Sequence, residues 1–150
     1  MRYTLFALVH NLSAGARLAL FRRVDLAAFR VDLAQWLLLV LVSALVDVAL
    51  DAARAGPGAV WSFAGVNGEL FALGELMLVS ALIAGLARDP AVFLALPIVV
   101  LAAFPILAVL HAVPAMLDVQ WPESYQAGFD LVLRLWMIFV CMREDDAANI

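Results

Sequence analysis

Long runs without a charged side chain limit the fold of this sequence more than any other feature. Residues 33–46, 76–87 and 91–110 contain no Asp, Glu, Lys or Arg. A transmembrane helix needs about 20 mainly apolar residues. Apolar residues make up 67% of the 150 residues and charged residues only 15%, which excludes an ordinary soluble enzyme. The sequence therefore predicts an all-α membrane protein.

Start and stop signals divide the apolar region into four predicted transmembrane helices, which form a four-helix bundle. Ser, Asp and Asn mark helix starts because their side chains accept hydrogen bonds from the first free backbone N–H groups. Proline within a span removes one backbone hydrogen bond and bends the helix. The predicted spans are about residues 33–54 (cap Asp32, with Gln35 third), 68–87 (cap Asn67), 91–113 (cap Asp89, then Pro90, with bends at Pro97 and Pro105) and 125–142 (cap Ser124).

The N-terminal segment is predicted to form an amphipathic helix in the membrane interface. A cleaved signal peptide is the alternative, but His10 and Asn11 interrupt its apolar region. Leu5, Leu8, Val9, Leu12, Ala16 and Leu20 share one helical face, and His10, Ser13 and Arg17 share the other. The predicted domains are residues 1–31 as the interfacial segment, 32–143 as the transmembrane domain and 144–150 as an acidic tail.

The distribution of arginine predicts the orientation. Five arginines lie in the N-terminal segment, Arg88 lies between the second and third spans, and Arg143 follows the fourth. The opposite side carries only Arg54. By the positive-inside rule both termini are cytoplasmic. All nine basic residues are arginine, a bias typical of GC-rich bacterial genomes, so the predicted location is the bacterial inner membrane.

Ionisable side chains inside the predicted spans form the candidate site. Such groups cost about 2.5 to 3.5 kcal/mol at bilayer depth unless they find a partner or water. At about 1.5 Å per residue, a carboxylate from each of spans one, two and four lies about 8 to 10 Å inside the outer end of its helix. One arginine is placed to neutralise them. The predicted intramembrane polar cluster consists of Asp47, Asp51, Glu75, Asp130 and Arg134.

The sequence contains no motif for nucleic-acid binding, metal binding or catalysis. A net charge of -4 argues against a nucleic-acid binder. The single cysteine, Cys141, forms no internal disulfide or cysteine zinc site, and His111 has no second histidine at helical spacing. No phosphate loop, GxSxG or HExxH motif occurs. The sequence therefore predicts no enzyme and no catalytic, cofactor or metal site, and its expected partners are the lipid bilayer, further copies of the chain and other membrane proteins.

One stretch resembles a known family. Residues 11–25, NLSAGARLALFRRVD, followed by four closely spaced predicted spans, resemble the start of Yip-family membrane domains. The similarity is to the N-terminal membrane region of some proteobacterial proteins whose C-terminal part is a legumain-like cysteine peptidase. The chain lacks the eukaryotic Yip signature DLYGP, a fifth span and a peptidase dyad. The resemblance implies an anchoring or scaffolding part with no catalytic residue.

Two functions from different classes follow from these observations. The first is a non-catalytic membrane domain that anchors or scaffolds partner proteins. The second is a small transporter or a proton- or cation-linked channel subunit that uses the intramembrane carboxylates. In a purely structural interpretation, Arg134 pairs with Asp130 or Glu75 and fixes helix register, while Asp51 lies at the interface.

Overall fold

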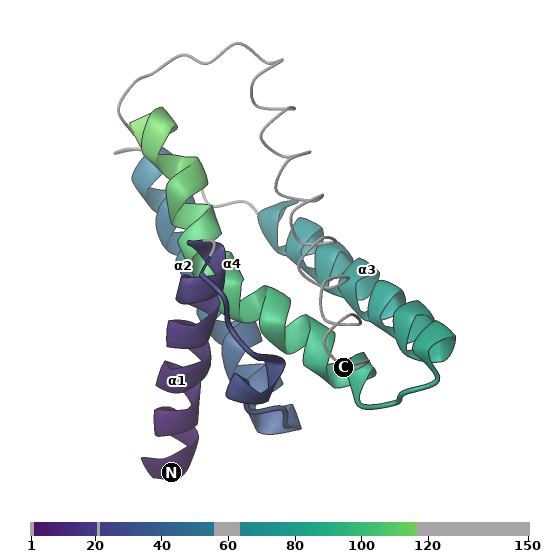
Figure 1. The fold of residues 1–150 in the computed structure, drawn as a ribbon. Helices are drawn as coiled ribbons and strands as arrows, with labels where there is room; N and C mark the ends of the chain where they lie inside the picture. Colours follow the sequence, from purple (N-terminus) through teal and green to yellow (C-terminus); the bar gives the residue numbers. More distant parts are fainter. Residues whose placement is uncertain (1, 21, 56–63, 117–150) are drawn as a thin grey trace. The chain divides into compact units, whose positions relative to one another are not determined.

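Four α-helices make up nearly all of the regular structure in the computed structural model, which describes residues 2–20, 22–55 and 64–116 (Figure 1). Residues 1–112 form one compact unit, and the last turn of the fourth helix begins a second unit. The elements in chain order are α1 (Arg2–Ala19), the short 3-10 helix η1 (Leu26–Ala28), α2 (Leu33–Ala55), α3 (Ala64–Ala87) and α4 (Val92–Met116). The all-α class predicted from the sequence is confirmed for these residues.

Three of the helices are long and apolar enough to cross a membrane. Within the described residues these stretches are Leu33–Ala55, Leu70–Ala87 and Val92–Val113. They correspond to the first three predicted spans. The fourth predicted span, with Asp130 and Arg134, and the predicted acidic tail lie outside the described residues. Helix α1 is not among the three stretches.

The start of α2 follows from one carboxylate. The Asp32 side chain accepts a hydrogen bond from the backbone N–H of Gln35 at 2.8 Å. The backbone carbonyl of Asp32 accepts the next hydrogen bond, from Trp36 N–H at 3.0 Å. These two bonds satisfy donors that a helix start leaves free. The predicted cap at Asp32 is confirmed.

A short turn joins α3 to α4. The Asp89 carboxylate accepts a hydrogen bond from Ala91 N–H at 2.9 Å, so Asp89 stabilises the entry to α4 as predicted, but the helix begins at Val92 and not at Pro90. Asp89 N–H in turn donates to the carbonyl of Ala84 at 3.2 Å. Arg88, which follows the last residue of α3, has a positive φ of 55°. This left-handed conformation is common just after the end of a helix. The end of α3 and the start of α4 therefore share one hydrogen-bonded turn.

The predicted start of the second span at Gly68 is wrong. Helix α3 already begins at Ala64, so Asn67 lies inside the first turn and is not the cap. A capping residue needs a non-helical backbone, and the helical backbone of Asn67 excludes that role.

Helix α4 continues through its prolines. Figure 1 shows α4 changing direction about halfway along its length. A proline in a helix removes one N–H donor and its ring crowds the preceding turn, which kinks the helix. Bends are expected at both Pro97 and Pro105; one change of direction is visible, and the helix is unbroken across both prolines.

Much of the buried core lies on one part of α4 and one face of α1, and Leu39 of α2 is also fully buried. On α4, Ile98 and Ala102 are almost completely buried, with Val99, Leu101 and Ala103 beside them. On α1 the buried face is built from small residues around Asn11. Gly15 lies so close to α4 that a Cβ atom there would meet the backbone carbonyl group of Ala102 and, at 2.7 Å, the backbone nitrogen of Ala103. Close approach of helix backbones is the usual role of small residues at helix interfaces in membranes.

Candidate functional site

A buried polar network connects α1 to the start of α2. Asn11 and Gln35 are both fully buried. Gln35 Nε2 donates a hydrogen bond to the carbonyl oxygen of Thr4 at 3.0 Å, and Asn11 Nδ2 lies 3.4 Å from Gln35 Oε1. Because a buried amide without partners is costly, these bonds hold α1 in one position along α2.

The same network includes the segment just before α2. Arg30 N–H donates to Asn11 Oδ1 at 2.8 Å, and Asn11 Nδ2 donates to the Arg30 carbonyl at 3.1 Å. The Arg30 guanidinium forms an exposed ion pair with Asp32 at 3.2 Å. Asp32, which caps α2, thus follows two residues after Arg30, whose backbone is hydrogen-bonded to Asn11 of α1.

Sequence reasoning misses the role of both amides. The pattern shows Asn11 only as an interruption of an apolar run, and Gln35 only as the third residue after a cap. The missed signal is a stripe of buried residues on α1, at helical spacing, that lies between the two predicted faces. The stripe contains Ala7, Asn11, Ala14, Gly15 and Leu18.

Helix α1 therefore has three faces and not two. The predicted polar face, His10, Ser13 and Arg17, is exposed. On the predicted apolar face Leu5, Val9 and Leu20 are exposed, and Leu8, Leu12 and Ala16 are half-buried. The third face, around Asn11 and Gly15, packs against the protein.

The acidic residues of α2 differ in their surroundings. Asp47 is half-buried, one turn beyond the buried Ser43. Asp51 is exposed, and its Oδ1 lies 3.8 Å from Arg54 Nη1 in an ion pair along the helix surface. The Ser43 hydroxyl is buried and has no hydrogen-bond partner among the described residues. The side of α2 that carries buried polar groups therefore includes Ser43 and Asp47, whereas Asp51 and Arg54 are exposed.

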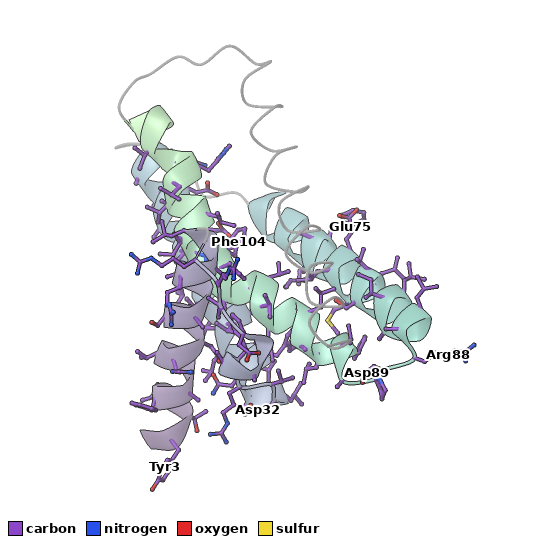
Figure 2. The ribbon with its side chains drawn as sticks, viewed as in Figure 1. Tyr3, Asp32, Glu75, Arg88, Asp89 and Phe104 are labelled. Carbon is purple, nitrogen blue, oxygen red and sulfur yellow. The ribbon has the colours of Figure 1, made fainter. Side chains whose placement is uncertain are left out.

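Glu75 lies on the exposed side of α3. Figure 2 shows its side chain pointing away from the helix. No described residue forms an ion pair or hydrogen bond with it. Asp130 and Arg134 lie outside the described residues, so the complete cluster stays a prediction.

Metal-ion coordination has no visible set of ligands in the part of the chain that the structure describes. No group of three or more His, Cys, Asp or Glu side chains is close enough together to hold a metal ion there. His111 is exposed near the end of α4.

The regular structure of the described residues is helical. Three of the helices are, by length and composition, able to cross a membrane. No family model, curated protein or solved structure matches the chain. Its function must therefore be argued from its own residues.

Proposed function

We propose that this chain is a non-catalytic integral membrane domain that anchors or scaffolds partner proteins in the bacterial inner membrane. It has four transmembrane helices, an interfacial N-terminal helix and cytoplasmic termini. The resemblance of residues 11–25 to Yip-family membrane domains agrees with this role. The proposal assigns no catalytic, cofactor or metal site to the chain.

The observation that carries the proposal is the apolar surface of α3. Seven large apolar side chains of this helix are exposed, and Phe71 and Leu86 reach 70% and 85% exposure. They are Leu70, Phe71, Leu78, Val79, Leu82, Ile83 and Leu86. Soluble proteins rarely expose a patch of this kind, whereas lipid tails or a partner helix cover it without cost.

The interfacial position proposed for α1 rests on its two exposed faces, whereas Gly15 contacts Ala102, ten residues inside the apolar stretch Val92–Val113. One face is fixed to the protein through Asn11 and Gly15. The neighbouring exposed face carries Leu5 and Val9, which suit acyl chains, and the next carries Arg17, which suits headgroups and water. A helix divided in this way is stable where lipid, water and protein meet.

The arginines of the described residues agree with the proposed orientation. Arg22, Arg23 and Arg88 are exposed and lie on the side assigned to the cytoplasm. Arg54 lies at the opposite end of α2 from Asp32. This asymmetry is the one that the positive-inside rule requires.

Reporter fusions and membrane fractionation test the proposal together. Alkaline phosphatase is expected to be active when fused after residue 58, and a fluorescent protein when fused after residue 89 or residue 150. The chain should stay in the pellet after alkaline carbonate extraction. Release into the supernatant, or a reversed reporter pattern, would contradict the proposal. A photo-crosslinker at Leu78 should give protein adducts if the chain scaffolds partners, with Arg88 as the solvent-facing control position; adducts with lipid alone would refute scaffolding.

Transport is the second candidate function, and one observation favours it. Ser43 is buried and Asp47 is half-buried on the same face of α2, so polar groups line the inner side of an otherwise apolar helix. Ionisable groups in such positions mark ion or proton pathways in many membrane proteins. A proteoliposome flux assay should compare the parent with Asp47→Asn, and Asp51→Asn serves as the exposed control. Flux lost only in Asp47→Asn supports transport, and no flux in the parent refutes it.

A further inference from the structure

Ser43 and Ser80 are both buried inside apolar helices, but they differ in their hydrogen bonds. Ser80 of α3 is fully buried, and its hydroxyl donates to the carbonyl oxygen of Leu76, one turn earlier, at 2.7 Å. This bond is a common way to satisfy a buried hydroxyl within a helix. Ser43 of α2 is only 4% exposed, and its hydroxyl has no partner among the described residues. Because buried polar groups are nearly always hydrogen-bonded, Ser43 needs a partner from elsewhere.

A second buried donor lies on the same side of α2. The indole Nε1 of Trp36 is buried without a partner among the described residues. Trp36 precedes Ser43 by seven residues, or about two helical turns, so the two residues share one side of α2 and lie about 10 Å apart along its axis. At this separation they do not bond to each other. The indole N–H can only donate and the hydroxyl can donate or accept, and water is a partner for both.

The same side of α2 becomes more exposed towards the C-terminal end of the helix. Asp47, one turn after Ser43, is half-buried. Asp51, one turn later again, is exposed, with 71% of its side chain accessible. We call this series, Trp36, Ser43, Asp47 and Asp51, the α2 stripe. Its burial increases continuously from Asp51 to Ser43.

The α2 stripe reaches the middle of the apolar layer. Ser43 lies ten residues, or about 15 Å, inside the apolar stretch Leu33–Ala55. This distance is half of the hydrocarbon thickness of a bilayer, which is about 30 Å. Between Ser43 and the exposed end of the stripe, each turn of α2 carries a polar side chain.

Two kinds of partner can satisfy the Ser43 hydroxyl. One is a side chain of the predicted span 125–142, where the polar candidates are Asp130 and Arg134. These ionic groups match the carboxylate of Asp47 better than they match a neutral hydroxyl, because charged partners form the stronger hydrogen bonds. The other is water, which is small and neutral and usually makes two to four hydrogen bonds when it is buried.

We propose that Ser43 and Asp47 bind water in the middle of the bilayer, and that this water enters along the α2 stripe from the Asp51 end. The two side chains are one turn apart on one side of the helix, within reach of a shared ligand. The inference rests on the proposed function, because it requires α2 to span the bilayer with its C-terminal end outside. It supplies the aqueous path that the transport hypothesis needs.

The test measures whether a cationic, membrane-impermeant methanethiosulfonate reagent reaches residue 43 in the full chain. The native cysteine is removed by Cys141→Ala, and Ser43→Cys then places a thiol of similar size on the stripe. A thiol reacts as the thiolate, which forms in water and not in lipid. In spheroplasts, which expose the outer surface, Ser43→Cys should react at least about tenfold faster than Leu41→Cys.

Leu41 is the matched control because it lies at nearly the same depth and is 55% exposed, on the apolar surface of α2. Exposure alone predicts the opposite order of reactivity, with residue 41 faster than residue 43. Asp47→Leu in the Ser43→Cys chain should slow the reaction about tenfold, because an apolar side chain interrupts the stripe. An unchanged rate in that variant would overturn the inference.

Two further results separate this inference from the proposed function. Asp51→Cys should react in spheroplasts and not in inverted membrane vesicles, which expose the cytoplasmic surface. The reverse pattern at residue 51 would refute the proposed orientation of α2. Outer labelling of residue 51 together with a residue 43 that reacts no faster than residue 41 would refute only the water site and would assign Ser43 a protein partner. Circular dichroism and carbonate extraction check that each variant is folded and inserted.

Discussion

Asn11 pairs its side-chain amide with both backbone groups of Arg30. Arg30 N–H donates to Asn11 Oδ1 at 2.8 Å, and Asn11 Nδ2 donates to the Arg30 carbonyl at 3.1 Å. The geometry imitates one rung of a β-sheet, formed here between a helix side chain and a connecting segment. It places the chain just before α2 against α1 without any regular structure in between.

Asn11→Ala should therefore destabilise the protein by about 2 kcal/mol, because it leaves buried polar groups without partners. Unfolding in mild detergent, followed by circular dichroism, measures the loss. Ser13→Ala, an exposed change on the same helix, should alter stability by less than about 0.5 kcal/mol. Equal stability of the two variants would show that the network contributes nothing.

Gly15→Ala should destabilise the protein by about 1 to 3 kcal/mol, although alanine favours a helix. The added methyl group would meet the backbone of Ala102 and Ala103, which cannot rotate away as a flexible side chain could. Gly85→Ala is the matched control, since no atom lies within 4 Å of the position that a Cβ would take there. It should stabilise α3 by about 0.5 to 1 kcal/mol. Opposite signs in one unfolding assay are the expected result; two stabilising changes would refute the close contact between α1 and α4.

Asp32→Ala should lower stability by about 1 kcal/mol, because the start of α2 loses its cap. Asp32→Asn keeps an oxygen that can accept the bond from Gln35 N–H and should retain most of the stability. Both variants lose the exposed ion pair with Arg30, which contributes little. An equal loss in both variants would assign the effect to the ion pair and not to the cap.

Arg88→Gly should stabilise the turn between α3 and α4 by about 1 kcal/mol, because a side chain in the left-handed region carries a steric cost that glycine avoids. Arg88→Ala removes the charge and keeps the strained backbone, so it should give no such gain. Thermal unfolding of the reconstituted protein compares the three chains. A gain of the same size in Arg88→Ala would identify charge as the cause.

Those parts of the fold that depend on local chemistry could be predicted from the sequence. The caps at Asp32 and Asp89 and the bend in α4 each follow from one residue and its immediate neighbours, and all three are present. The predicted start of α3 is four residues too late, and the helix propensities of Ala64, Gly65 and Val66 do not explain the longer helix.

The candidate site was harder to predict, because it depends on how helices face one another. Periodicity shows which residues share a face but not which face packs. It separates the polar and apolar faces of α1, yet the face that docks contains Asn11 and Gly15, neither of which is a typical core residue. For the same reason the spacing of Glu75 indicates its depth and could not indicate its outward direction.

The turn at Arg88 and Asp89 also constrains how the chain enters a bilayer. Only residues 88–91 separate α3 from α4. This connection is too short to pass out through the headgroup layer and back again. If both helices span, the last residue of one and the first of the other lie at the same membrane surface, and the pair inserts as a single hairpin. The side chains of Arg88 and Asp89 then meet water at its tip, where the backbone bonds of the turn are already made.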